Sequence, residues 1–150
     1  MQKKSRKNDG SYYEQHRMLN QQFGVEEKLK QLKADLLMHF PDWEISPPNL
    51  SRPDDPSIFI RYNDLIRIQC MVKSRTDNVI VNILLQQNTK ANRAEFVELG
   101  KMLGVQVVGK NAMHMKLPGW KKEIPKLHQL DDIIARLREA WRTLDKVYKA

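Results

Sequence analysis

Hydrophobic residues recur along this chain with two different periods, and the period changes several times. In residues 25–40 the apolar side chains are spaced alternately by four and three positions, which is typical of one face of a helix. They are Val25, Leu29, Leu32, Leu36 and Phe40. Similar spacing predicts further helices over 88–104 and 127–150. Pro41 follows the first helix and Gly104 ends the second, as expected at helix C-termini.

Between these helices the apolar residues alternate with polar ones, which is the period of a β-strand. The alternation predicts strands over 57–62, 65–73 and 79–87, joined by the turns ND and SRTDN into an antiparallel meander. Two shorter segments, 105–109 and 112–117, are predicted to form a second hairpin. The stretch from Pro41 to Pro56 holds five prolines in 16 residues, which excludes a central strand there.

The resulting order of elements, α-β-β-β-α-β-β-α, predicts an α+β fold. A single antiparallel sheet of about five strands, with helices on one face, buries the apolar residues most simply. The chain of 150 residues has a normal size for one domain. We expect residues 1–20 to form a flexible basic arm, with a short helix from Ser11 onward, and residues 21–150 to form a single α+β domain.

The two central strands of the predicted sheet differ strongly between their two faces. The side chains expected to point away from the core are Leu65, Arg67, Gln69, Met71, Lys73, Ile80, Asn82, Leu84 and Gln86. Long cations and amides suit contacts to phosphates and base edges. The apolar members of the same face equally suit a partner protein, and a solvated antiparallel sheet has a similar composition.

Charge adds a preference for polyanions. The formal net charge is +8; residues 21–56 are net acidic, while the rest of the chain is net basic. An asymmetric basic surface attracts nucleic acid first, then anionic membranes or acidic proteins. Trp120 lies in a lysine-rich loop, where its indole either stacks a base or caps the core. The candidate nucleic-acid contacts are Lys3, Lys4, Arg6, Lys7, Arg67, Lys73, Arg75, Trp120, Lys121 and Lys122.

No pattern in the chain favours catalysis. Cys70 is the only cysteine and falls on the apolar strand face, so we expect an inert, buried thiol. The four histidines lack the helical spacing of a metal site, and the strands carry amides where a metal-dependent nuclease needs acids. The GVQVVG segment lacks the intermediate glycine of a phosphate loop. We predict a protein that is not an enzyme and has no catalytic residue, metal or cofactor.

Several segments carry a resemblance to a known family. They are SPPNLS, NVIVNILLQQ and NRAEFVELGKMLG, the last containing Asn92, Phe96 and Leu99 in an N-x-x-x-F-x-x-L pattern. With the element order, they make residues 25–148 resemble a bacterial domain of unknown function that occurs alone or at the C-terminus of nuclease-like proteins. A Pro-rich loop replaces the family's glycine-bearing stretch, and no nuclease portion is present. The resemblance therefore implies a fold more than an activity.

Together these observations predict a non-catalytic basic binding module that contacts nucleic acid, DNA or RNA, or belongs to a nucleic-acid-handling complex. The alternative is a protein-interaction, inhibitor or adaptor module that uses the outer sheet face or the C-terminal helix around Trp141, including formation of a homodimer. A diverged enzyme domain is a third reading, and it requires a pocket with convergent acids. The lone cysteine and the short apolar runs predict a cytoplasmic location and no membrane contact.

Overall fold

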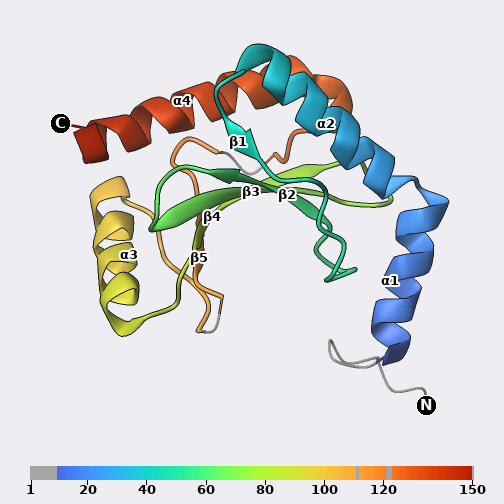
Figure 1. The fold of residues 1–150 in the computed structure, drawn as a ribbon, viewed down its shortest axis with the longest axis horizontal. Coiled ribbons are helices and arrows are strands. Elements are labelled where there is room, and N and C mark those ends of the chain that lie inside the picture. Colours follow the sequence, from blue (N-terminus) through green and yellow to red (C-terminus); the bar gives the residue numbers. More distant parts are fainter. Residues whose placement is uncertain (1–9, 111, 121–122, 150) are drawn as a thin grey trace.

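The computed structural model describes residues 10–110, 112–120 and 123–149, which form four α-helices and one sheet (Figure 1). The helices are Gly10–Gln22 (α1), Val25–His39 (α2), Lys90–Leu103 (α3) and Leu130–Lys149 (α4), the last preceded by the 3-10 turn Leu127–Gln129 (η1). The strands are Glu44–Ile45 (β1), Ser57–Arg61 (β2), Ile66–Val72 (β3), Val79–Leu85 (β4) and His114–Lys116 (β5). The predicted α+β fold with a single antiparallel sheet is confirmed.

The sheet is a meander in which the strands lie in chain order from β1 to β5. β3 and β4 pair along their full length, from Ile66 opposite Leu85 to Val72 opposite Val79. Residues directly opposite each other in a ladder share one face of the sheet, so the predicted inner and outer sets are correct for the residues within β3 and β4. The inner face of these two strands is buried except at Leu85, which is half-buried at the end of β4, and α2 and α4 lie over it (Figure 1).

The helices cover the sheet with the apolar residues that their spacing predicts. α2 buries Val25, Leu29, Leu32 and Leu36, whereas Phe40 lies just beyond its end. α3 is capped by Thr89, whose side chain accepts a hydrogen bond from the backbone N–H of Asn92. α4 and α3 complete the core with Phe96, Leu99, Ile133, Ile134, Leu137, Ala140 and Leu144. Burying each large apolar side chain contributes about 1.5–3 kcal/mol.

Two segments differ from the predicted strands. The Pro-rich stretch supplies β1, a two-residue edge strand in which Ile45 pairs with Ile60; an edge strand tolerates neighbouring prolines because one side of its backbone needs no partner. Residues 105–109 form no strand and make one isolated bridge, between Val108 and His114. They turn back against α3 instead, where a Cβ atom on Gly100 would lie 2.7 Å from Cγ2 of Val107.

The turn between β2 and β3 is wider than the predicted Asn-Asp turn. The side-chain oxygen of Asn63 accepts hydrogen bonds from the backbone N–H groups of Leu65, at 3.0 Å, and Ile66, at 2.9 Å. Leu65 consequently leaves the strand and is buried with the core at 9 % exposure, whereas the sequence pattern places it on the outer face. The wider turn also places Arg61 opposite Arg67 in the ladder.

The helix expected from Ser11 onward is present as α1, so the described part of the predicted arm is helical. α1 buries none of its residues, and Asn20 donates a hydrogen bond to the carbonyl of Pro53. The expected arm contacts Lys3, Lys4, Arg6 and Lys7 lie outside the described residues. No helix in the described ranges has both the length and the apolar character needed to cross a bilayer.

A chain of stacked aromatic rings, which the sequence pattern does not reveal, fixes α4 to the segment after α2. Phe40 stacks on Trp43 with a ring-centre distance of 3.7 Å, and Trp43 stacks on Trp141 at 4.2 Å. Tyr62 meets the edge of Trp141 and donates a hydrogen bond to the carboxylate of Asp145. Trp141 therefore packs against residues of its own chain.

Candidate nucleic-acid interface

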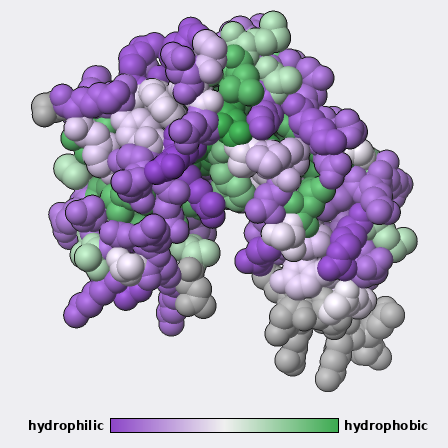
Figure 2. All heavy atoms as spheres, viewed as in Figure 1, coloured by the Kyte–Doolittle hydropathy of each residue, from purple (hydrophilic) through white to green (hydrophobic). Residues whose placement is uncertain are grey.

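The outer face of the sheet is the surface on which the sequence places most of its candidate contacts. Figure 1 shows no helix beneath this face, and Figure 2 shows the molecule hollowed there, between the side that carries α1 and the side that carries α3. The ladder registers arrange the outward side chains in rows across the strands. One row is Glu44, Arg61, Arg67, Leu84 and His114, and the next is Phe59, Gln69, Asn82 and Lys116.

Two arginines face each other across β2 and β3. Arg61 and Arg67 are direct partners in the ladder, and residues in such positions have Cα atoms only about 4.5–5.5 Å apart. Like charges placed directly opposite each other destabilise a sheet. Repulsion between the two guanidinium groups therefore destabilises the sheet on its outer face.

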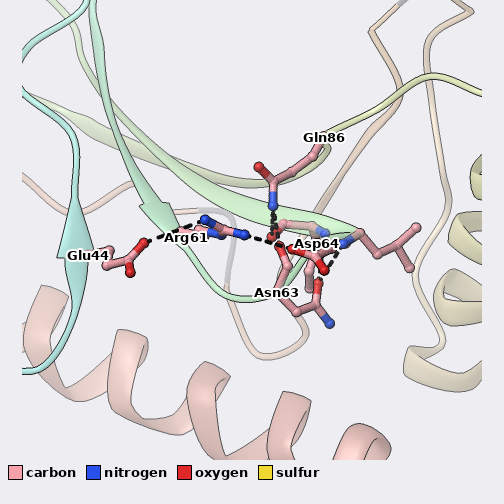
Figure 3. A network of polar contacts seen from close by, with 7 residues as sticks. Glu44, Arg61, Asn63, Asp64 and Gln86 are labelled. Atoms are coloured by element: carbon pink, nitrogen blue, oxygen red, sulfur yellow. Dashed lines mark hydrogen bonds and ion pairs between the residues drawn. The ribbon is translucent and has the colours of Figure 1, made fainter.

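Arg61 is compensated by two acids. One of its guanidinium nitrogens lies 2.7 Å from the Asp64 carboxylate, and another lies 3.9 Å from the Glu44 carboxylate. Figure 3 shows the Arg61 guanidinium between these two groups. Beside them, the Gln86 side chain donates a hydrogen bond to the backbone carbonyl of Asn63. Arg61 remains exposed, so both ion pairs are open to solvent and to competing anions.

Arg67 has no such compensation. Within the described parts of the chain, no acidic group lies within ion-pair distance of it, and its Nε is buried without a hydrogen-bond partner. Its guanidinium carbon lies 4.1 Å from the centre of the Phe59 ring, a cation–π contact. Burial lowers the pKa of Arg67 because desolvation disfavours the charged form. Buried, unsatisfied donors are rare in folded proteins, and each calls for an explanation such as a bound water or ion.

Both arginines line a groove of about 520 Å³ at the β1 edge of the sheet. α2 contributes Lys33 to the lining, β1 and the residues before it contribute Trp43 and Glu44, and β2 contributes Phe59. We call this site the Arg67 groove. Three cations and one carboxylate line it, so its charge is positive, and its volume falls in the range of about 300–1,000 Å³ that is common for ligand sites.

The amides of the outer face hold the sheet together. The side chain of Gln69 donates to the Ser57 hydroxyl at 2.8 Å and accepts from the Asn82 amide at 3.4 Å, which links β2, β3 and β4. Gln86 donates to the backbone carbonyls of Asn63 and Ile66. Each of these amides uses at least one N–H donor within the protein, so fewer of their polar groups are left for base edges than the sequence pattern suggests.

The apolar part of the outer face is smaller than its sequence suggests. Met71 is only 7 % exposed and Leu65 belongs to the core, while Ile80 and Leu84 are half-buried. A partner protein gains little by covering residues that folding has already removed from water. This observation weighs against the outer face as a hydrophobic docking surface.

The remaining candidate contacts do not gather around the Arg67 groove. Lys73 and Arg75 are exposed at the far end of β3, beside the turn to β4. Trp120 is 9 % exposed and packs in the core, with the Arg136 guanidinium 5.6 Å from its ring centre. Of the two predicted roles, Trp120 thus caps the core, and its ring is not available to stack a base. Lys121 and Lys122 lie outside the described residues.

The sequence pattern did not single out Lys33, Trp43 or Arg61. Arg61 follows the strand alternation and so could have been assigned to the outer face, but nothing in the pattern shows that Arg67 is opposite it. Lys33 lies on the polar side of α2 and has the same sequence signature as any solvated lysine. These side chains meet only because β1 closes the edge of the sheet beneath α2.

The buried thiol, the metal-ligand types and the charges of the groove bear on the chemistry that the described residues offer. Cys70 is fully buried, as expected, and burial raises the pKa of its thiol to about 12. Across the described ranges, no group of three or more histidine, cysteine, aspartate or glutamate side chains is arranged to hold a metal ion. Glu44 is the single acid in the lining of the Arg67 groove. The groove offers cations and a supported guanidinium plane, which suit an anionic ligand.

The chain matches no protein-family model, no curated protein and no solved structure, so its resemblance to a bacterial domain stays a prediction and its function is argued from its own geometry.

Proposed function

We propose that this protein is a non-catalytic module that binds nucleic acid with the outer face of its sheet. The observation that carries the proposal is the pair of opposed arginines, Arg61 and Arg67, of which Arg67 has no acidic partner in the described residues. A fold that keeps an uncompensated guanidinium on an open, hollowed face has a place for an anion. The phosphate of a nucleic acid backbone is an anion that arginine binds well.

Other exposed cations lie elsewhere on the sheet and in the turn between β3 and β4. Lys116 is exposed next to Asn82, and Lys73 and Arg75 are exposed at the opposite end of the sheet. Phosphates in a nucleic acid strand are regularly spaced, so a row of separated cations matches a strand better than it matches a single small anion. The net charge of +8 adds long-range attraction for the same partner.

The alternative uses of these surfaces have less support. Two of the four apolar residues expected to receive a partner protein, Leu65 and Met71, are buried. The helix expected to form a homodimer uses Trp141 for stacking on Trp43, and it buries Leu137 and Leu144 in the core of its own chain. No observation on these surfaces therefore favours protein binding, which we keep as an alternative outcome of the test.

The test is fluorescence anisotropy with labelled single-stranded DNA, duplex DNA and RNA, each titrated at about 50 and 200 mM salt. Every phosphate neutralised adds about 0.9 to the slope of log affinity against log salt on duplex DNA. We expect Arg67→Gln to weaken binding and to reduce this slope by about one. The matched control is Arg142→Gln, which removes the same charge from an exposed position on α4.

The two variants separate a specific face from general attraction. If Arg67→Gln and Arg142→Gln weaken binding equally, only net charge matters and the outer face is not the binding surface. If no nucleic acid binds with a salt-dependent affinity, the proposal is wrong and the protein-partner alternative replaces it.

A further inference from the structure

We infer that the Arg67 groove takes one nucleotide of a single-stranded nucleic acid, with its base stacked on the Arg67 guanidinium and its phosphate held by Arg61 and Lys33. This inference rests on the proposed function and names the form of nucleic acid that the site selects. It departs from the sequence-based expectation, in which the amides read base edges and Trp120 stacks a base.

The stacking surface comes from the contact between Arg67 and Phe59. The guanidinium carbon lies over the Phe59 ring, 4.1 Å from its centre, so the aromatic ring is in contact with the cation. Guanidinium planes stack on nucleobases as well as on aromatic rings, and an arginine supported by a ring presents its opposite side to the groove. Lysine keeps the charge but has no plane to stack, which makes the two roles of Arg67 separable by mutation.

The burial of Arg67 favours a single-stranded nucleic acid over a duplex. The residue is half-buried in a groove of about 520 Å³. The walls of the groove come from α2, β1 with its flanking residues, β2, β3 and the residue after β4. In a duplex each base is paired and stacked between its neighbours, so its face reaches a protein group only if the base is flipped out. A single strand offers unpaired bases at no such cost, and stacking of this kind tolerates every base.

The charges around the stacking surface suit a phosphate. Lys33 has no acidic partner within ion-pair distance among the described residues, and it lines the groove together with Arg61. The one carboxylate in the lining, Glu44, is only loosely paired with Arg61, at 3.9 Å. A phosphate that bonds to Arg61 at a normal charge-assisted distance of about 2.8 Å replaces this contact with a stronger one.

The experiment compares three labelled probes of equal length in the full chain: a single-stranded oligonucleotide, the same strand with abasic sites, and the duplex. The abasic strand keeps the phosphates and removes the bases. For the unmodified protein we expect the single strand to bind about tenfold more tightly than the abasic strand, because each stacked base contributes substantially to such complexes. We expect the duplex to bind more weakly than the single strand.

Two charge-conserving variants complete the design. Arg67→Lys should bind the abasic strand with the same affinity as the unmodified protein. Its affinity for the base-containing strand should fall to that same value. Arg61→Lys, the matched control from the opposite position of the ladder, should lower both affinities by the same factor. Circular dichroism and thermal unfolding confirm that both variants are folded. If Arg67→Lys does not fold, the comparison of probes with the unmodified protein decides the question.

The outcomes separate this inference from the function on which it rests. Equal salt-dependent binding of the base-containing and abasic strands overturns the stacking site and leaves the proposed nucleic-acid function standing. Tighter binding of the duplex than of the single strand does the same. Absence of salt-dependent binding to all three probes overturns both.

Discussion

Replacing Arg67 with methionine should make the protein more stable while it weakens nucleic-acid binding. The guanidinium is half-buried, its Nε has no hydrogen-bond partner, and Arg61 lies directly opposite it. Methionine retains an unbranched stem of similar length that packs against Phe59, and it removes both the charge and the unsatisfied donor. The site would thus be one at which function is retained at the expense of stability.

The expected size of the effect follows from three terms. Relieving a buried unsatisfied donor contributes about 1–3 kcal/mol, and removing the cross-strand pair of like charges contributes about 0.2–1 kcal/mol. Loss of the cation–π contact with Phe59 costs about 0.5–1 kcal/mol. We therefore expect Arg67→Met to raise the free energy of unfolding by about 1–2 kcal/mol, which corresponds to a Tm increase of about 4 °C for a chain of this size.

Urea unfolding followed by circular dichroism measures this change, with the m-value expected to stay constant because the fold is the same. Arg142→Met is the matched control: its side chain is 65 % exposed on α4, so the free energy of unfolding should change by no more than about 0.5 kcal/mol. A decrease in stability of Arg67→Met would refute the reasoning, since it would show that the guanidinium stabilises the sheet and that its role is structural.

Two further predictions concern the fold. The hydrogen bond from Tyr62 lowers the pKa of Asp145 below its ordinary value, so this contact stabilises the protein above the unfolded-state pKa of about 3.9, and the stabilisation is lost as the pH falls through the lower folded-state pKa. The stability difference between the unmodified protein and Tyr62→Phe, measured by urea unfolding, should accordingly be largest near neutral pH and shrink below about pH 4; a constant difference would contradict this assignment. Gly100→Ala should destabilise the protein by about 1–3 kcal/mol in thermal unfolding, because the new methyl group meets Val107 at 2.7 Å and the Val105 carbonyl at 3.0 Å, and adding Val107→Ala should recover part of the loss.

The sequence predicted most of the helices and strands because their signals are local. The apolar spacing in α2 and α4, the cap at Thr89 and the left-handed glycine at Gly104 each depend on residues within a few positions. Strand alternation likewise assigned the inner and outer faces of β3 and β4 correctly. Burial of Cys70 followed from the same alternation.

The register between β2 and β3 shows how a local reading fails. A two-residue turn at Asn63 and Asp64 would pair Arg61 with Ile66 and would mismatch the faces of the two strands. The Asn63 side chain widens the turn by bonding to the backbone, and this offset places Arg61 opposite Arg67. The alternation within each strand contains no information on that offset.

The composition of the outer face was likewise read correctly, but the sequence did not show which of its side chains are bonded or buried within the fold. Gln69 and Asn82 appear as free amides in the sequence, but the ladder brings them side by side and they bond to each other. The sequence pattern places Leu65 and Met71 on the outer face, yet packing buries them. A side chain's partners are set by neighbours that are distant in the chain, which a periodic pattern does not encode.

By itself, the sequence determined the fold class, the faces of the residues within β3 and β4 and the basic character of the chain, because period and charge are properties of the chain. The tertiary structure alone decided that Lys33, Arg61 and Arg67 meet in one groove, that the amides are used internally and that Arg67 is left without an acid. The physical reason is that binding geometry depends on the register and on the closure of β1 against the sheet edge, and both are set by contacts between segments far apart in sequence.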